Sequence, residues 1–405
     1  MHWLRRRYAP RCSGQRAFRL HRRRVVEIVA IWSWLGLRGR RGGFVQPLLC
    51  RLEREREMNR PRPITIVGGG LAGLTLGIGL RRQSIPVVLW EQGHYPRHRV
   101  CGEFISGHGQ ETLKRLGLLE LLLEAGARPA YTAAFFAKQR SFPAHPLPQP
   151  ALCISRFNLD EALAEQFKQS GGELHCGTRA PSTPAEGTVR STGRRAEPEA
   201  DAEGWRWFGL KAHAHRIALH ADLEMHTRAD GYVGLCRLED GKTNVCGLFR
   251  RKKGEAVSVF GITQRLRGES GSILHQRLEA AEFEEASSCA VGGLSLHPRR
   301  AIDSGECCLG DSVTMIAPVT GNGMSMAFES AELAVAPLAA YARGEIEWQT
   351  ARQTVARECD RTFAKRLWWA DRLQRMLFWQ STQAWVLGLA LRWETSWRFL
   401  FWATR

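Results

Sequence analysis

Apolar positions around residue 64 predict a strand, a tight turn and a helix in immediate succession. Residues 64–67 (ITIV) are apolar or β-branched, which is typical of a buried parallel strand. The run GGGLAG at 68–73 follows at once and opens a helix-forming segment at 71–82. A second apolar run at 86–91 ends in Glu91, 18 residues after the last glycine. This order predicts a dinucleotide-binding unit in which Glu91 accepts hydrogen bonds from a ribose.

Each part of the glycine turn has a physical role in holding a dinucleotide. Gly68 makes the tight turn, Gly70 lets the backbone approach a pyrophosphate, and Gly73 lets the helix lie close to the sheet. The amide groups of Leu71 and Ala72 begin the helix, and together with the helix dipole they stabilise an anionic group.

A second turn of the same kind lies far along the chain. Residues 307–309 form a short apolar run that ends in Gly-Asp, and PVTGNG at 318–323 opens a helical stretch that continues to residue 342. A carboxylate after a strand can hold a sugar-like hydroxyl, and the turn offers backbone donors to a second group. Two such sites suit a long cofactor. The candidate contacts here are Gly310, Asp311, Pro318, Gly321, Asn322, Gly323 and Met324.

Together the two turns resemble the FAD-dependent oxidoreductases that include geranylgeranyl reductases, aromatic-ring hydroxylases and flavin halogenases. The resemblance covers roughly residues 61–345. It implies FAD as the cofactor, with Asp311 at the ribitol and residues 318–323 beside the flavin ring. It also implies an α/β fold: a Rossmann-like FAD-binding domain with an inserted antiparallel β-sheet substrate domain and a helical C-terminus.

The same resemblance sets the expected domain boundaries, with the substrate domain inserted into a discontinuous FAD-binding domain. We expect a basic arm at 1–57, FAD-binding segments at 58–195 and 296–345, the substrate sheet at 196–295, and a helical Trp-rich segment at 346–405.

Two further segments resemble family motifs next to the cofactor. Residues 96–103 (PRHRVCGE) are similar to PRxKxCGG, with Arg99 in place of Lys and Glu103 in place of Gly. This implies that Arg97 contacts the cofactor and that Cys101 lies near the flavin as the candidate catalytic residue. Without the motif, this cysteine would be interpreted as a small buried apolar residue.

The second segment, SRFNLD at 155–160, is similar to the R-x-x-L-D motif. The resemblance implies that Arg156 contacts the cofactor. An isolated arginine before a helix is more often a solvated cap or an ion-pair partner.

The chain departs from the family in the segment that precedes the inserted domain. Aromatic hydroxylases carry an Asp-Gly pair after a β meander, whereas residues 191–195 read STGRR without the aspartate. The preceding residues 178–189 are few and hold two prolines. Either the meander is trimmed or the gene is degraded, and the adenine side of the flavin site is where we expect a weakness.

Two substrate-domain motifs are only partly present. The halogenase WxWxIP element is matched at 205–210 by its two tryptophans alone, so halogenation is not expected. The reductase Y-x-W-x-F-P element is matched at 231–237 by Tyr232 alone, which is the candidate substrate contact. A prenyl substrate is therefore not implied.

Alternating apolar positions at 207–261 predict an antiparallel sheet with a hairpin turn at 239–242. The histidines near it are spaced by 2, 5 and 6 residues, which does not group them on one face with carboxylates, and we expect no metal site. Eleven cysteines without a CxxC pair fit reduced thiols in a cytoplasmic protein. These histidines are His213, His215, His220 and His226.

The net charge of +18 belongs to the two ends of the chain. Residues 1–60 carry +12 and residues 361–405 carry +6, while the 300 residues between them hold 34 basic and 34 acidic side chains. A nucleic-acid partner is therefore not expected.

Each end has two interpretations. The arm at 1–57 is an over-long gene start or disordered, with targeting or surface binding as the alternative. Seven of the 14 tryptophans lie after residue 361, where they either cap the core or, around 376–391, form an interfacial helix that makes a peripheral membrane contact.

The expected activity is that of an FAD-dependent oxidoreductase, either a monooxygenase or a double-bond reductase, acting on a hydrophobic or aromatic small molecule. NAD(P)H is the expected donor and docks transiently, because no separate nucleotide motif for it is visible. The alternatives are a non-catalytic or degraded FAD-binding paralogue and a membrane-surface binding protein.

Overall fold

The computed structural model describes residues 60–137, 139–181, 185–194, 201, 204–254, 261–378, 388 and 393–404. The chain divides into two compact units, Met1–Arg60 and Pro61–Arg405, and every helix and strand given below belongs to the second. Three expectations fall outside the described residues: the basic arm at 1–57, the start of the substrate domain at 196–200, and most of the interfacial stretch at 376–391.

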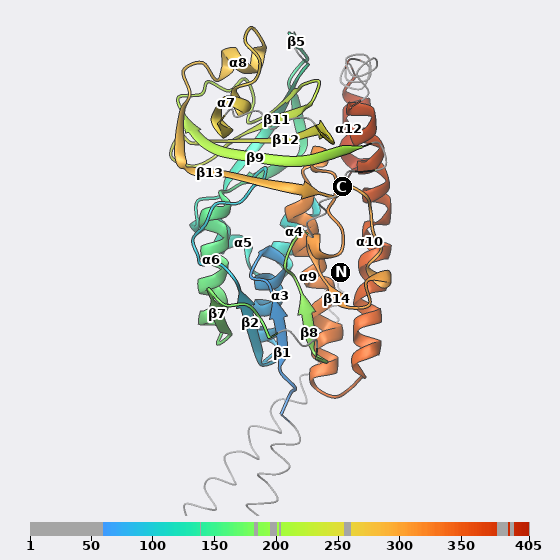
Figure 1. Ribbon diagram of the computed structural model, residues 1–405. Coiled ribbons are helices and arrows are strands. Elements are labelled where there is room, and N and C mark those ends of the chain that lie inside the picture. The colour runs from blue at the N-terminus through green and yellow to red at the C-terminus, as the bar shows by residue number, and fades with distance from the viewer. Residues whose placement is uncertain are drawn as a thin grey trace, which may run out of the picture. The chain divides into compact units, whose positions relative to one another are not determined.

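A five-stranded parallel sheet forms the lower half of this unit in Figure 1. Its strand order is β14-β8-β1-β2-β7, and each neighbouring pair is parallel. Ile64, Ile66 and Leu89 have no exposed surface and share one apolar core with the helices around the sheet. The strands are β1 (Ile64–Val67), β2 (Val87–Glu91), β7 (Glu173–Cys176), β8 (Thr188–Arg190) and β14 (Cys307–Cys308).

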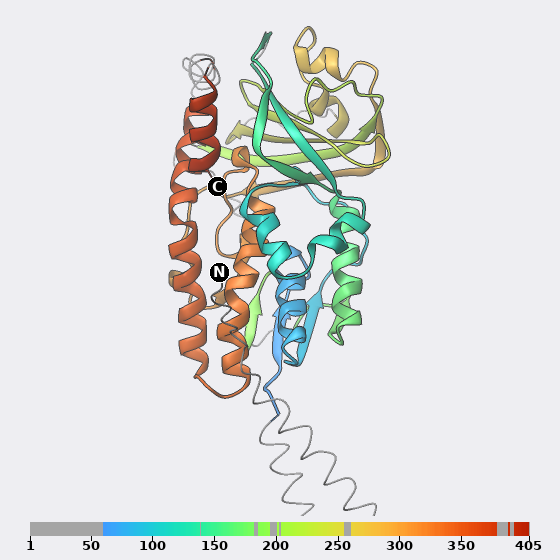
Figure 2. The same ribbon diagram turned by 180° about the vertical axis from the view of Figure 1, so that it is seen from behind.

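Helix α3 (Leu71–Arg82) is the most deeply buried helix next to this sheet. All ten of its residues from Leu71 to Leu80 are buried, in keeping with a helix that is covered on every side. It packs against α6 (Arg156–Gln169) and α9 (Gly323–Ala342), and α9 also packs against α4 (His108–Arg115). Figure 2 shows α4 and the short α5 (Leu119–Glu124) in turquoise and α6 in green from behind.

A larger sheet covers the upper half of the unit in Figure 1. Its order is β13-β9-β12-β11-β10-β4-β6-β3, with β5 paired to β4, and its pairs are antiparallel except for β10 with β4. The strands are β3 (Phe104–Ile105), β4 (Arg128–Ala137), β5 (Arg140–Ser141), β6 (His145–Cys153), β9 (Trp205–His215), β10 (Leu223–Thr227), β11 (Gly231–Arg237), β12 (Thr243–Lys252) and β13 (Glu282–Leu294).

This sheet draws strands from both sides of the expected domain boundary. The substrate sheet was expected to begin at residue 196, but β3 to β6 precede that residue and belong to the same sheet. The pairing of β4 with β10 joins these earlier strands to the later ones. The expected hairpin is present between β11 and β12, and Asp240 and Gly241 have positive φ in its turn.

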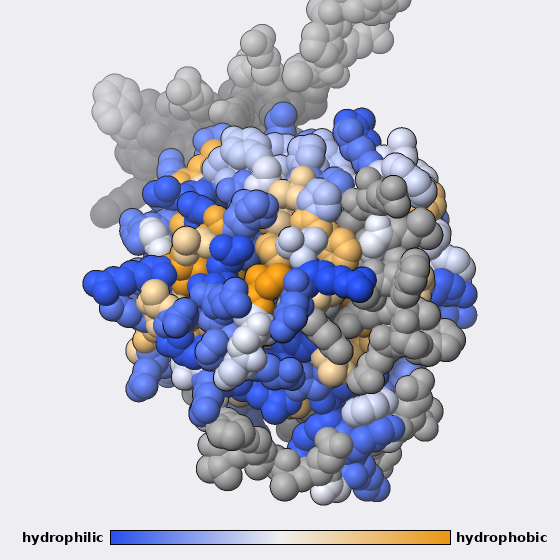
Figure 3. All heavy atoms as spheres, turned by 90° about the horizontal axis from the view of Figure 1, so that it is seen from above, coloured by the Kyte–Doolittle hydropathy of each residue, from blue (hydrophilic) through white to orange (hydrophobic). Residues whose placement is uncertain are grey.

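The two faces of β9 differ in character. Ala212 and Ala214 lie in an apolar core with residues of α7 (Ile262–Arg267) and α8 (Ile273–Arg277). Lys211 and His213 alternate with them, so they lie on the opposite face, toward the parallel sheet. Seen from above, the face around α7 and α8 is mostly hydrophilic, with small separate apolar patches (Figure 3).

Three helices are described in the C-terminal part, with most of residues 379–392 left out of the description. Helix α9 is followed by the long α10 (Trp348–Leu377), which packs against it, and by α12 (Glu394–Ala403). Trp397 of α12 is buried, and its Nε1–H donates to the carbonyl oxygen of Pro146 at 2.9 Å. None of the helices in the described part of the chain has both the length and the apolar character that a membrane span requires.

A buried ion pair joins α9 to α10. Arg366 donates from Nη1 and Nη2 to the two carboxylate oxygens of Glu329 at 2.8 and 2.5 Å, and both side chains are 8% exposed. Removing one partner of such a pair leaves an uncompensated charge in the core, whereas removing both does not.

We therefore expect the substitution Arg366→Met to lower the free energy of unfolding by about 3 kcal/mol. The double variant Glu329→Met/Arg366→Met should recover most of this loss. Urea denaturation measures both. The exposed pair of Arg361 with Glu358 is the control, because Arg361→Met should cost less than about 1 kcal/mol. Equal losses for Arg361→Met and Arg366→Met would contradict the prediction.

Candidate functional site

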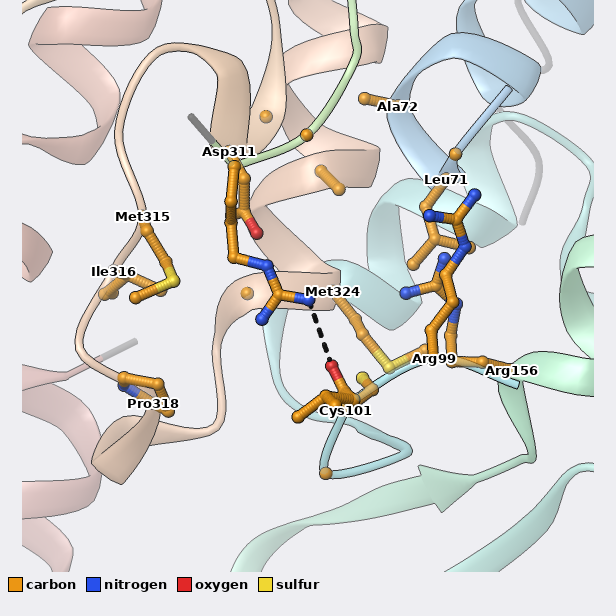
Figure 4. A pocket seen from close by; sticks show the side chains of 18 of the residues that line it. Leu71, Ala72, Arg99, Cys101, Arg156, Asp311, Met315, Ile316, Pro318 and Met324 are labelled. Atoms are coloured by element: carbon orange, nitrogen blue, oxygen red, sulfur yellow. Dashed lines mark hydrogen bonds between the residues drawn. The ribbon is translucent and has the colours of Figure 1, made fainter. Parts of the chain in front are cut away.

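A cavity of about 1350 Å³ lies between the parallel sheet and the larger sheet, and Figure 4 shows part of its wall. This volume exceeds the usual range of small-molecule sites, so it can hold a cofactor and a substrate together. Fifteen of the expected site residues line it, while Gly73 and Asn322 do not. The fifteen are Gly68, Gly70, Leu71, Ala72, Glu91, Arg97, Cys101, Arg156, Tyr232, Gly310, Asp311, Pro318, Gly321, Gly323 and Met324.

The first glycine turn leaves room for a ligand at one position and none at another. Gly68 has a φ of +106°, and a Cβ there would lie 2.6 Å from the carbonyl carbon of Ser191. A Cβ on Gly70 would meet no atom within 4 Å, so this face of the turn is open to the cavity. No side chain caps the start of α3, which leaves its first amide groups available to an anion. Gly73 packs against Gly68 and Ser191 and supports the turn from behind.

Glu91 is held rigidly at the end of β2. Its two carboxylate oxygens accept from the amides of Gly69 and Gly93, each at 2.8 Å, and Arg97 forms an ion pair with it at 2.6 Å. Burial alone would raise the pKa of Glu91, but the Gly93 amide and Arg97 outweigh it, so the pKa is lowered. The carboxylate is therefore ionised at neutral pH, and a ribose hydroxyl would have to share its oxygens with Arg97.

Arginines and acids alternate beside this carboxylate. Arg156 donates to both oxygens of Asp160 at 2.7 and 2.8 Å, and Arg99 donates to Asp160 at 3.0 Å. Arg99 also lies 3.6 Å from Glu91. Figure 4 shows the side chains of Arg99 and Arg156 next to each other on the cavity wall. With Arg97 the group has three positive charges against two negative ones, which suits an anionic ligand.

Asp311 lies across the cavity from these arginines (Figure 4). It belongs to the short 3₁₀ turn Gly310–Ser312, and no hydrogen bond or ion pair within the described residues ends on its carboxylate. Burial raises the pKa of Asp311, while Arg194 and Arg156 oppose this rise. An acceptor without a partner at this place fits a ligand hydroxyl.

Arg194 was not anticipated from the sequence. It lines the cavity near Asp311 and donates to the carbonyl oxygen of Val100 at 3.4 Å. It directly follows Gly193, in the STGRR segment where the family has an Asp-Gly pair. The loss of that aspartate was the sequence feature that could have drawn attention to Arg194.

The second glycine turn packs tightly against the larger sheet. A Cβ on Gly321, whose φ is +67°, would collide with the ring of Phe104. The side chain of Asn322 is 1% exposed, bonds to the carbonyl oxygen of Thr404, and accepts from Ser106 Oγ at 3.3 Å. Asn322 therefore fixes α12 to the turn with its side chain, which explains why it does not line the cavity.

Cys101 lines the cavity next to a buried charge that the motif comparison did not anticipate. Burial raises the pKa of the Cys101 thiol despite the nearby Arg156, which disfavours a thiolate at neutral pH. Glu103 stands where the family has glycine, adopts a φ of +58°, and has no exposed surface. Its carboxylate accepts from His213 Nε2 at 2.7 Å and from the Arg156 amide at 2.9 Å.

The nitrogen-bearing side chains around Glu103 come from β9 and from the loop after β2. Lys211, also fully buried, lies 3.3 Å from Glu103 and 3.1 Å from His98 Nδ1. Burial and Lys211 lower the pKa of His98 to about 4, so this ring is neutral at pH 7. The cluster ties the larger sheet to the loop that carries Cys101.

The histidine spacing was misleading in one respect. His213 contacts the carboxylate of Glu103 at 2.7 Å, because the fold brings these distant residues together. His226 contacts that of Glu224 at 2.9 Å, because residues two apart lie on the same face of β10. His215 also lies 3.6 Å from Glu284. No group of three or more metal-binding side chains occurs within the described residues.

The other half of the cavity is apolar. Strands of the larger sheet contribute Met225, Tyr232 and Leu248, while α10 and α12 contribute Leu377 and Phe401. The hydroxyl of Tyr232 is buried and has no hydrogen-bond partner among the described residues, and burial raises its pKa. This half suits an apolar molecule with few polar groups.

The shortened segment before Gly193 still supports the first glycine turn. The described residues between Cys176 and Thr188 include no strand, yet β8 pairs with β1 and β14. Ser191 donates from its amide to Val67 O at 2.7 Å and from Oγ to Gly68 O at 2.6 Å. The parallel sheet therefore runs without a break from β14 through β8 to β1, although the segment before β8 is short.

Comparison with known proteins agrees with this geometry. A family model described as "FAD binding domain" matches residues 62–203. The flavin-dependent brominase Bmp2 is similar in structure, with a TM-score of 0.66, 16% identity, and coverage of 84% of this chain and 92% of that chain. PqsL, a probable FAD-dependent monooxygenase from Pseudomonas aeruginosa, gives a TM-score of 0.61 at 15% identity and covers 82% of this chain and 100% of its own.

One curated protein is also similar in sequence. Conditioned medium factor receptor 1 of Dictyostelium discoideum is 23% identical over an alignment of 325 positions, and the match covers 67% of this chain. The chain spans 62% of the length of that relative.

These comparisons and the geometry agree on the fold and on the cofactor-binding segment. The resemblance to the FAD-dependent oxidoreductases is thus confirmed: residues 62–203 match an FAD-binding domain, and the chain has the fold of flavin-dependent monooxygenases and halogenases.

Proposed function

We propose that the protein binds FAD and uses it to oxidise or reduce a hydrophobic small molecule, with monooxygenation as the favoured reaction. The observation that carries this proposal is the two-part cavity. One part has an open glycine turn, three arginines and the unpartnered carboxylate of Asp311, whereas the other part is lined by apolar side chains. A probable FAD-dependent monooxygenase of the same fold supports this choice over double-bond reduction.

The part of the cavity with the glycine turn, the arginines and Asp311 is called the cofactor half, and its residues fit FAD at both ends. The open face of Gly70 and the first amides of α3 suit a pyrophosphate, and Glu91 suits a ribose. Asp311 offers a free acceptor for a ribitol hydroxyl. When bound, FAD supplies the redox chemistry by accepting a hydride and passing electrons to oxygen or to the substrate.

The protein's own contribution is to bind, orient and exclude water. The apolar half of the cavity holds the substrate with few polar contacts, and α10 and α12 close it on one side. Cys101 lines the cavity, and its raised pKa keeps the thiol protonated. Its contribution is to shape the wall and not to supply a thiolate. Tyr232 offers a buried hydroxyl as a donor to a polar group on the substrate.

A non-catalytic FAD-binding paralogue is the second candidate, because Arg97 already occupies part of the Glu91 carboxylate and the family aspartate before Gly193 is missing. The two candidates differ in whether bound FAD can be reduced by a nicotinamide donor.

The first test is the visible spectrum of the full chain with FAD under anaerobic conditions. We expect a yellow protein whose flavin absorbance is bleached by NADPH or NADH and returns on admission of oxygen. Bleaching by dithionite but by neither nicotinamide would exclude NADPH and NADH as direct donors and favour the non-catalytic alternative. A colourless protein that does not take up added FAD would refute the proposal itself.

A matched pair of glycine substitutions tests the cofactor half. Gly70→Val places its side chain in open space, so we expect at least a tenfold loss of FAD affinity, about 1.4 kcal/mol. Its effect on the stability of the FAD-free protein should stay below about 1 kcal/mol. Gly68→Ala strains a positive φ and collides with the backbone of Ser191, so it should lower the stability of the FAD-free protein. Flavin fluorescence titration and urea denaturation separate the two effects.

A further inference from the structure

Exposed aromatic side chains gather on one part of the molecule. Seven large apolar side chains are exposed among the described residues, and five of them lie between residues 368 and 402. Trp368 is 47% exposed, Phe399 52% and Trp402 65%. The other two, Leu123 and Tyr131, belong to α5 and β4. Soluble surfaces expose single apolar side chains routinely, but a contiguous group indicates a contact surface.

Four of these five side chains, all except Trp393, lie on one side of α10 or on α12. On α10, residues 365, 368, 369, 372 and 376 follow a helical spacing that places them on one side. The ring of Trp369 contacts Trp368 at 4.9 Å and Phe399 of α12 at 5.7 Å between centroids. We call the surface formed by Trp368, Trp369, Met376, Phe399 and Trp402 the aromatic face.

Cationic side chains are interleaved with the rings of the aromatic face. The guanidinium of Arg372 lies 3.4 Å from the ring centre of Trp368, and Lys365 Nζ lies 3.8 Å from that of Trp402. No carboxylate of the described residues lies within ion-pair distance of Lys365 or Arg372. Residues 361–405 as a whole carry a net charge of +6.

The same two helices line the apolar half of the cavity with their other sides. Leu373 and Leu377 of α10 and Phe401 of α12 contribute to its wall. Met376 belongs to both surfaces, because it lines the cavity and is 40% exposed on the aromatic face. Through Met376, the aromatic face therefore adjoins the apolar part of the cavity.

We propose that the aromatic face rests on an anionic lipid bilayer and that the apolar substrate passes from the bilayer into the cavity beside Met376. The second part of this proposal rests on the proposed function, whereas the first does not. Tryptophan rings favour the interface between headgroups and acyl chains, and lysine and arginine beside them attract anionic headgroups.

The observations favour a membrane over a protein partner. Excess positive charge without carboxylate partners, mixed with large flat rings, complements a surface that is uniformly negative and apolar below. Only two of the seven exposed large apolar side chains among the described residues lie outside 368–402, so such side chains are concentrated in this part of the chain.

The test is flotation of the FAD-loaded full chain with vesicles of phosphatidylcholine, with and without phosphatidylserine. We expect binding to the vesicles that contain phosphatidylserine, and weaker binding as salt rises. The double variant Phe399→Ser/Trp402→Ser should lower the partition coefficient at least tenfold. Lys365→Glu/Arg372→Glu should remove the preference for phosphatidylserine.

Tyr131→Ser is the matched control, because it removes an aromatic side chain that is 57% exposed and belongs to β4 rather than to the two helices of the aromatic face. It should float like the unmodified protein. Retention of FAD by each variant shows that it has folded. Equal flotation of Phe399→Ser/Trp402→Ser and the unmodified chain would overturn the proposal. A dimer in light scattering that is lost in the same variant would do so too, since a second copy would then cover the face.

The outcomes for membrane binding and for redox chemistry are separate. A chain that binds FAD and is reduced by NAD(P)H but does not float retains the proposed function and loses the membrane proposal. A chain that floats but takes up no FAD retains membrane binding and loses the proposed function.

Discussion

The buried carboxylate of Glu103 is the contact on which the wall of the cavity depends, because it joins the loop that carries Cys101 to β9 and to α6. It accepts hydrogen bonds from His213 of the larger sheet and from the first amide of α6, and it lies 3.3 Å from Lys211. An ionised group without exposed surface is tolerated only when its oxygens are satisfied in this way. The loop that carries Cys101 is thereby fixed between the two sheets, and the wall of the cavity gains a defined position.

The side chains on either side of this contact divide the cavity into a charged part and an apolar part. Arginines and acids stand in pairs around Glu91 and Asp160, so the charged part is preorganised for a polar ligand. Apolar side chains from the larger sheet and from α10 and α12 follow directly. One continuous space thus changes from polar to apolar along its length.

Local sequence patterns were sufficient for the elements whose partners are close along the chain. The β1–α3–β2 unit was predictable because strand, glycine turn and acid act within one short segment, and Asp311 because it follows a strand directly. The Glu103–His213 contact was not predictable, since 110 residues separate the two and no sequence motif contains both of them. The same reason applies to the larger sheet: its β4–β10 pair joins segments that local alternation cannot connect.

The position of α12 has a consequence for how the cavity is completed during synthesis. Domains begin to fold from the N-terminal side while the chain is still being made. Residues 393–404 emerge after every other described segment, and they reach the second glycine turn through the bond between Asn322 and Thr404. Until α12 has docked, the apolar half of the cavity therefore lacks the part of its wall that Leu400 and Phe401 supply.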